Sequence, residues 1–337
     1  LARTSTSVEE KKVKAWDAVV KNPKKNGIYS TSAGDKIASV SEGNEKTRVI
    51  EPDAIGTGTL VITATVSGSD EQIEREKRFN QNMDGIFTPA DILLPRQGLD
   101  MTRWAVVACD QFSAQPEYWE SLSDYVGGAP SALRLMLPEA FLGAPDVNAR
   151  KAAMEEKMKE YIVGDIFDNI AYSYIFVERS LPEGEIRRGL VGKLDLEAYD
   201  WTSGSQSPVR ATEATVPERL PTRVELRRAA VLEMPHIVLF IDDPADTVLG
   251  SVTPGQLLYD FDMYGGGGHI RGSRVTGDAC ERICALIDAL PGTLRFAMGD
   301  GNHSLAAAKN HWEELKAAGA PMDHPARYAL AELENLR

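Results

Sequence analysis

The sequence is poor in cysteine and has no long hydrophobic run, and each shortage excludes a class of protein. Three cysteines among 337 residues cannot form the disulfide framework of a small secreted protein, so we expect reduced thiols. The most hydrophobic stretch, at 237–241 within a mixed segment, is far shorter than the roughly 18 residues of a membrane span. We therefore expect a cytoplasmic protein without a membrane span.

Positive charge is also scarce. The chain carries 37 Lys plus Arg against 50 Asp plus Glu, a net charge of -13. General nucleic-acid binding is excluded, because neutralising phosphates requires clustered basic residues. With 43% hydrophobic and 26% charged residues, the composition is that of an ordinary globular protein. Because the overall charge is negative, an anionic ligand would have to be held by a few positively charged or N–H groups at one site.

The first eighty residues differ from the rest in their pattern of predicted helices and strands. We predict a helix at 9–20, strands at 37–40 and 59–66, and a polar helix at 71–82. The second strand resembles the closing strands of a bacterial immunoglobulin-like repeat; an irregular β extension is the alternative. Residues 1–83 are therefore predicted to be a separate N-terminal extension. Export would follow only if this extension were a genuine cell-surface domain.

From residue 84 onward, short β runs alternate irregularly with helical patterns. This alternation predicts an α+β (mixed α/β) domain at 84–337, and its abrupt end in an apolar element suggests truncation at the C-terminus. Strands are predicted at 105–108, 172–177, 188–194, 236–241, 293–298 and 328–333, and helices at 117–125, 149–166, 278–290 and 304–317.

The sharpest motif is Gly-Asp-Gly-Asn-His-Ser, between an apolar strand and a series of strong helix formers. A glycine turn at a helix start presents free N–H groups and the positive end of the helix dipole, which suits an anion or a phosphate. We assign ligand binding to Gly301, Asn302 and Ser304. Asp300 could hold a metal or a hydroxyl substrate, and His303 could stabilise phosphate charge or move a proton. Alternatively, Asp300 or Ser304 merely caps the helix and His303 supports the turn.

A second cluster lies in a non-periodic segment that ends at Pro217. Arg210, Thr212 and Arg219 are candidate phosphate ligands, because arginine pairs bidentately with phosphate. Glu213 or Glu218 is a candidate base or Mg²⁺ ligand. The alternative is a surface loop of ion pairs that contribute little to stability.

Two weaker candidates complete the set. Four glycines precede His269. Such a run forms either a linker or lid, or a segment whose backbone approaches a ligand closely. In the second case His269 would contact the ligand. No Gly-Lys-Ser or Gly-Lys-Thr follows, so this is not a P-loop. Cys109 and Asp110 come directly after a predicted strand, where ligand sites often lie. A nucleophilic role for Cys109 would require a nearby base.

Taken in order, these stretches resemble the bacterial and archaeal family of domain of unknown function 1015, over about residues 84–333. Residues 1 to about 80 do not resemble this family, and its members normally continue beyond 328–333. The matching stretches are 89–95, 104–111, 117–119, 187–192, 210–213, 266–270 and 299–304.

The resemblance implies a function for the last motif. In many family members this motif reads Asp-Gly-His-His-Arg, which looks like the phosphate-binding box of the ParB/sulfiredoxin-like fold. Proteins with this fold include a free-serine kinase. This implies binding of ATP or ADP with Mg²⁺ and phosphoryl transfer to a small hydroxyl substrate such as serine. Here Ser304 replaces the arginine, so Arg210 or Arg219 would have to supply the charge. The alternative is a non-catalytic module that senses a ligand.

Overall fold

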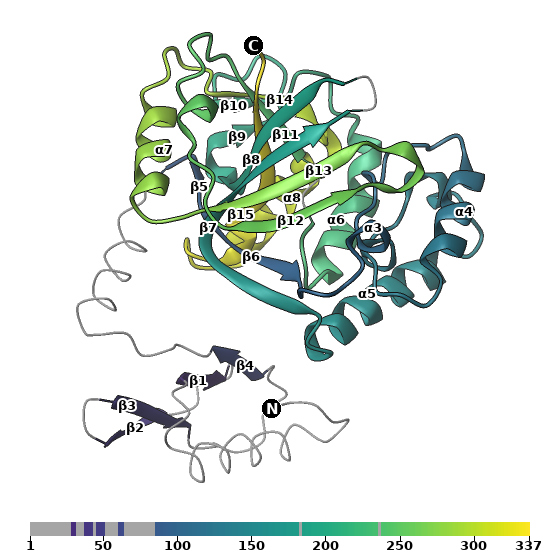
Figure 1. Cartoon of the computed structure of the whole chain (residues 1–337), viewed down its shortest axis with the longest axis horizontal. Coiled ribbons are helices and arrows are strands. Elements are labelled where there is room, and N and C mark those ends of the chain that lie inside the picture. The colour runs from purple at the N-terminus through teal and green to yellow at the C-terminus, as the bar shows by residue number, and fades with distance from the viewer. Residues whose placement is uncertain are drawn as a thin grey trace. The chain divides into compact units, whose positions relative to one another are not determined.

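The structure, a computed structural model, describes residues 85–181, 184–234 and 237–337, together with the backbone of four strands nearer the N-terminus (Figure 1). The chain divides into two compact units, Leu1–Asn82 and Met83–Arg337.

The N-terminal unit contains a four-stranded sheet in the order β2-β3-β1-β4. Its strands are β1 (Ile28–Thr31), β2 (Ile37–Glu42), β3 (Glu45–Ile50) and β4 (Leu60–Thr63). β2 and β4 overlap two predicted strands. The helices predicted at 9–20 and 71–82 lie outside the described residues, and the immunoglobulin-like resemblance stays a prediction.

The C-terminal unit is built on one mixed sheet of eleven strands, so the α+β prediction is confirmed. The path runs β12-β13-β7-β8-β15-β11-β14-β10-β9, with β5 paired to β8 and β6 to β7. The strands are β5 (Phe87–Thr88), β6 (Ala90–Pro95), β7 (Phe167–Ser180), β8 (Ile186–Asp195), β9 (Tyr199–Asp200), β10 (Val209–Arg210), β11 (Ile237–Ile241), β12 (Leu257–Asp262), β13 (His269–Val275), β14 (Phe296–Asp300) and β15 (Tyr328–Asn335).

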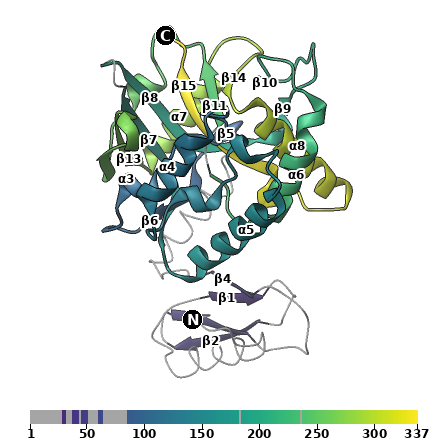
Figure 2. The ribbon, with the colours of Figure 1, turned by 90° about the vertical axis from the view of Figure 1, so that its right-hand side faces the viewer.

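The helices of this unit include α3 (Met101–Trp104), α4 (Pro116–Val126), α5 (Val147–Val163), α6 (Leu220–Ala229), α7 (Asp278–Asp288) and α8 (Asn302–Ala317). α6 and α8 pack against each other (Figure 2). No helix within the described parts of the chain is long and apolar enough to cross a membrane.

Helix α5 shows both the strength and the limit of periodicity. Met154, Met158 and Tyr161 are buried in one cluster with Trp104, as their spacing predicts. Ile162, predicted on the same stripe, is instead 46% exposed. The reason is that residue 162 lies at the edge of the stripe, about 40° beyond Met158 on the side away from Tyr161.

The strand predicted at 105–108 is wrong. These residues follow α3 as an irregular, half-buried segment. Val106 and Val107 pack against the α4 side chains Trp119, Leu122 and Val126 rather than within the sheet. A four-residue apolar run predicts burial but carries no information on strand pairing.

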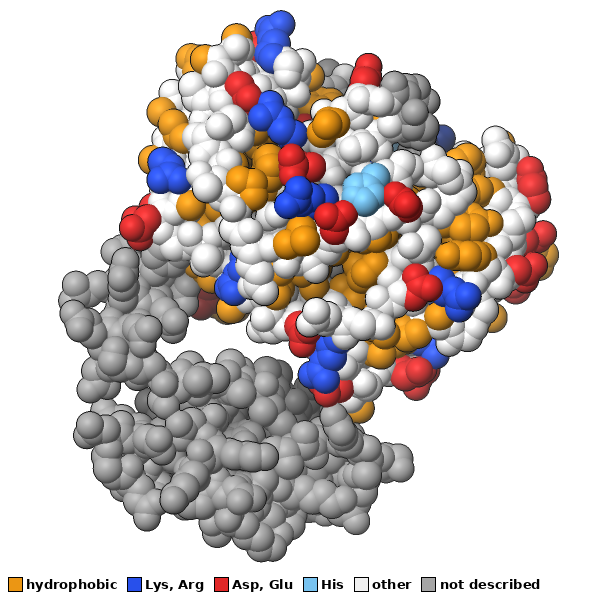
Figure 3. Space-filling model, viewed as in Figure 1, with side chains coloured by type: hydrophobic (Ala, Val, Ile, Leu, Met, Phe, Trp, Pro, Cys, Tyr) orange, Lys and Arg blue, Asp and Glu red, His pale blue; other side chains and the backbone are white. Residues whose placement is uncertain are grey.

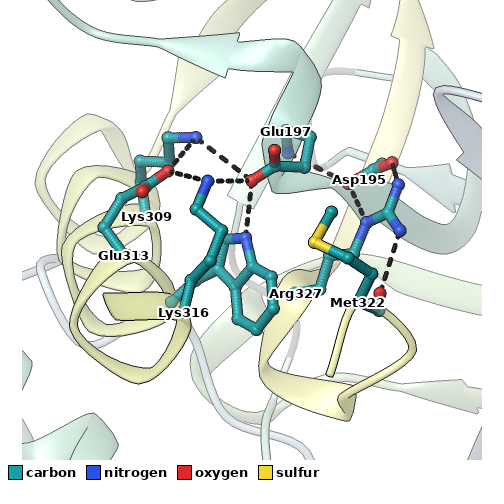
Figure 4. Close-up of polar contacts among 8 residues, drawn as sticks. Asp195, Glu197, Lys309, Glu313, Lys316, Met322 and Arg327 are labelled. Carbon is teal, nitrogen blue, oxygen red and sulfur yellow. Dashed lines mark hydrogen bonds and ion pairs between the residues drawn. The ribbon is translucent and has the colours of Figure 1, made fainter. Parts of the chain in front are cut away.

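A network of polar contacts ties α8 to the end of β8 (Figure 4). Trp312 is fully buried, and its Nε1 donates to Glu197 Oε1 at 2.7 Å. Lys316 Nζ donates to the same carboxylate oxygen at 2.8 Å. Nearby, Arg327 donates through two nitrogens to both oxygens of Asp195, at 2.9 and 2.5 Å. These contacts anchor the second half of α8, whose N-terminus follows the end of β14 directly.

Candidate functional site

The strand–turn–helix predicted around Asp300 is present. β14 ends at Asp300 and α8 begins at Asn302. Gly301 between them adopts the left-handed conformation (φ 77°, ψ 27°), which only glycine takes at little cost. The Asp300 carboxylate accepts a hydrogen bond from the Gly301 amide at 2.7 Å. The 16-residue helix therefore directs its positive dipole end and its first N–H groups toward the space beyond the strand.

The loop that follows β10 packs against this turn. β10 runs parallel to β14, so the chain leaves both strands at the same edge of the sheet. Two motifs that lie almost ninety residues apart thereby form one site. Three hydrogen bonds join them: from Thr212 Oγ1 to the Met298 carbonyl (2.8 Å), from Asn302 Nδ2 to Glu213 Oε1 (3.3 Å), and from the Val216 amide to His303 Nε2 (3.2 Å).

His303 is held as a neutral ring. Its Nε2 accepts the Val216 amide, so the ring proton must lie on Nδ1. Burial lowers the pKa of His303, and the positive charges of Arg223 and Arg219 lower it further, while Glu213 opposes them. At neutral pH the ring therefore offers one N–H donor and adds no positive charge of its own.

Arg223 is a site residue that sequence reasoning missed. It lies four residues after Arg219, and its Nη1 donates to the Arg219 carbonyl at 3.0 Å. Arg223 also forms an ion pair with Glu139. The available signal was the i, i+4 spacing of the two arginines at the start of a helix, which brings them to one face. The predicted cluster ended at Arg219, so this spacing was not used.

The segment after α3 reaches the same site. The charges of Asp110, Arg223 and Asp300 all act on Cys109. Burial raises the Cys109 pKa to about 11, with Asp110 adding to the rise and Arg223 opposing it. A thiol that stays protonated at neutral pH is a poor nucleophile, which argues against catalysis by Cys109. The charge of Asp110 also acts on Arg223.

Three oxygen atoms in these segments lack hydrogen-bond partners although they are buried: Asn302 Oδ1, Thr215 Oγ1 and Asp110 Oδ1. Asn302 and Thr215 are only 5% and 9% exposed. Buried polar atoms are normally satisfied, so each such atom calls for a partner that the chain itself does not supply. Asn302 is the first residue of α8, and Thr215 precedes Val216, whose amide donates to His303 in the same helix turn.

The oxygen-rich character of the site fits Mg²⁺ only in part. Carboxylates at Glu213 and Asp300 are the hard ligands that this ion prefers. Within the described residues, however, no group of three or more His, Cys, Asp or Glu side chains could hold a metal ion by itself. Mg²⁺ would therefore be shared between these carboxylates and the oxygens of a phosphorylated ligand, the common arrangement for this ion.

Arg210 belongs to the correct segment but its side chain is engaged elsewhere. Its Nε donates to the Ser207 carbonyl at 2.6 Å, and its Nη2 bonds to the Gln206 carbonyl (3.2 Å) and to Thr293 Oγ1 (3.4 Å). These partners precede β10 and β14, whereas the α8 turn follows β14. The structure thus shows Arg210 bracing the start of the strands.

His269 lies at the start of β13, where Asp260 and Asp262 of β12 hold it. Its Nε2 is 2.6 Å from Asp260 and its Nδ1 2.7 Å from Asp262. Hydrogen bonding to Asp262, and then to Asp260, raises the His269 pKa. The preceding glycines form the β12–β13 turn. At Gly268 (φ +85°) a Cβ atom would lie 2.1 Å from the Ser180 carbonyl oxygen, so this glycine permits a close approach to β7.

The comparisons with known proteins agree with the resemblance seen in the sequence. The profile of the family described as "Protein of unknown function (DUF1015)" matches residues 93–337. Searches of curated proteins and of solved structures return no match. The likeness to the ParB/sulfiredoxin-like fold therefore stays a prediction. Since the profile covers well over half of the chain, including every residue of the α8 turn, the chain belongs to the DUF1015 family.

Proposed function

We propose that the α8 turn binds the phosphate groups of a nucleotide or another small phosphorylated ligand, and that the site transfers a phosphoryl group to a small hydroxyl substrate such as serine. The observation that carries the proposal is the hydrogen bond from the Val216 amide to His303 Nε2 at 3.2 Å, which joins the segment that leads to Arg219 to the N-terminus of α8. The positive charges of Arg223 and Arg219 lower the His303 pKa, in keeping with that arrangement. The chain as a whole carries a net charge of -13, so two arginines close together at the start of α6 are well suited to bind an anion.

Each group has a role in this scheme. The first N–H groups of α8 and the Nδ1–H of His303 donate to phosphate oxygens. Arg219, which is exposed, neutralises their charge, while Arg223 shares its charge with Glu139. Glu213, also exposed, accepts the proton of the acceptor hydroxyl. Mg²⁺, when bound, would neutralise charge on the phosphates. Phosphoryl transfer relies on this kind of positioning and electrostatic stabilisation.

Calorimetric titration with ADP and ATP, with and without Mg²⁺, tests the binding step. We expect Arg219→Ala to weaken nucleotide binding about tenfold or more, because a charged hydrogen bond is worth about 1.5–3 kcal/mol. Arg228→Ala is the matched control: Arg228 lies on α6, of which Arg219 is the N-cap residue, but it pairs with Glu314 at 2.8 Å in an exposed ion pair. Equal affinities for the wild type and Arg219→Ala would contradict the proposal.

A second function, ligand sensing without catalysis, is favoured by one observation. Asp300 already accepts a hydrogen bond from the amide of its own turn, which suits a structural carboxylate. Turnover of labelled ATP across a panel of hydroxyl acceptors separates the two functions. If nucleotide binds tightly but neither the wild type nor Glu213→Gln shows turnover, sensing is the better description.

The proposal places the protein in the cytoplasm. All three cysteines are free thiols, and Cys280 and Cys284 are buried in α7, as expected in a reducing compartment. Fractionation of cells that express the protein checks this point.

A further inference from the structure

Four aromatic side chains form a partly exposed cluster, here called the aromatic platform: Phe112, Tyr118, Tyr125 and Tyr264. Phe112 and Tyr118 stack nearly parallel, with ring centroids 3.9 Å apart and planes at 19°. Tyr264 joins Tyr125 at 4.6 Å and Tyr118 at 6.3 Å. Phe112 and Tyr125 are 39% and 37% exposed. In Figure 3, hydrophobic side chains gather over the region of α3 and α4 on the right of the view.

The chain links the platform to the candidate site. Phe112 follows Asp110 by two residues, so their Cα atoms lie within about 7 Å of each other. The Cys109 carbonyl accepts the Glu139 amide at 2.8 Å, and Glu139 pairs with Arg223. The segment that carries Phe112 is therefore tied at its start to the proposed phosphate ligands.

The backbone at Phe112 is strained. Its φ of 51° lies in the left-handed region, which is costly for a bulky residue. The conformation places the Phe112 ring flat against Tyr118 while the residue stays 39% exposed. A strained backbone that keeps a large apolar ring partly in water does not serve core packing. It suits a surface that a flat ligand completes.

We propose that the aromatic platform stacks the base of the nucleotide whose phosphates bind at the α8 turn, with Phe112 as the residue in face-to-face contact. This inference rests on the function proposed above and names its ligand class. Parallel rings favour a flat heteroaromatic partner, because stacking needs only a π face. Arg103 lies 5.4 Å from the ring centre of Tyr125 and adds a positive charge at the rim.

The test compares two ligands that share a diphosphate group, of which only one carries a nucleoside. ADP and inorganic pyrophosphate are titrated calorimetrically into the wild type, Phe112→Ala, Phe112→Trp and Met322→Ala. The last is a control that shortens another exposed apolar side chain, 47% exposed. We expect Phe112→Ala to weaken ADP binding about tenfold or more, with pyrophosphate affinity unchanged. Phe112→Trp should restore ADP binding, and the control should bind both ligands as the wild type does.

The outcomes separate this inference from the proposed function. If the wild type binds pyrophosphate but gains no affinity from the base, the platform has another occupant and only the phosphate site stands. If Phe112→Ala weakens both ligands equally, the residue supports the fold of the loop and the inference fails. If the wild type binds neither ligand, both proposals fail. Light scattering adds a further check: a dimer that Phe112→Ala dissociates would show that a second copy covers the platform.

Discussion

Replacing Glu334 by glutamine should stabilise the protein at alkaline pH and have little effect at acid pH. Glu334 lies on β15, opposite Gly189 of β8, and is only 4% exposed. Arg187 lies close to it, with Nε 2.9 Å from Oε1, and the charge of Arg179 also acts on it. Burial is the largest cause that raises the Glu334 pKa to about 7, and the nearby Glu332 adds to the rise. The native protein therefore holds a proton that the unfolded chain loses more readily.

The sign and size of the effect follow from that difference. The unfolded carboxyl has its ordinary pKa of 4.5, so it ionises as the pH rises above this value while the native carboxyl does not. Each pH unit in this window removes about 1.4 kcal/mol of stability. The loss ends near pH 7 and amounts to about 3 kcal/mol. Glutamine cannot ionise, so Glu334→Gln escapes the loss.

Urea denaturation at pH 5, 6, 7 and 8, followed by tryptophan fluorescence, measures the effect. We expect the unfolding free energy of Glu334→Gln to exceed that of the wild type by a few kcal/mol at pH 8, with the difference shrinking toward zero at pH 5. Glu178→Gln is the control, because Glu178 on β7 pairs in register with Arg188 of β8 rather than with β15. A difference that is independent of pH, or a variant less stable at pH 8, would refute the reasoning.

Three further predictions concern the framework and the histidines. Glu197→Ala should lower the unfolding free energy by about 1–3 kcal/mol, because the buried Trp312 Nε1 loses its acceptor; urea denaturation measures this, and a loss below 0.5 kcal/mol would contradict it. In NMR titrations His303 should titrate below its ordinary value of 6.5 and His269 above it, and added pyrophosphate should raise the pKa of His303 alone; the reverse order would refute the assigned contacts. Gly268→Ala should lower the melting temperature by several degrees, because its φ of +85° and the nearby carbonyl of β7 leave no room for a Cβ atom; an unchanged melting temperature would show that the turn adapts.

Much of the site was predictable because its parts are local. A glycine between an apolar strand and a run of helix formers suffices to place Asp300 at the end of β14 and His303 in the first turn of α8. Helical spacing likewise predicted the buried stripe of Met154 and Met158. In each case the signal lies within one or two turns of chain, where side-chain direction follows from backbone geometry.

What only the tertiary structure decided depends on strand pairing and on the direction of long side chains. The sequence by itself determined the family, the α+β class and the α8 turn. The parallel pairing of β10 with β14 brought Glu213 to that turn and turned Arg210 away from it, and the packing of α6 supplied Arg223. The reason is physical. Which strands become neighbours depends on the free energy of the whole sheet. An arginine side chain has about four rotatable bonds, so its direction is not defined until its partners are in place.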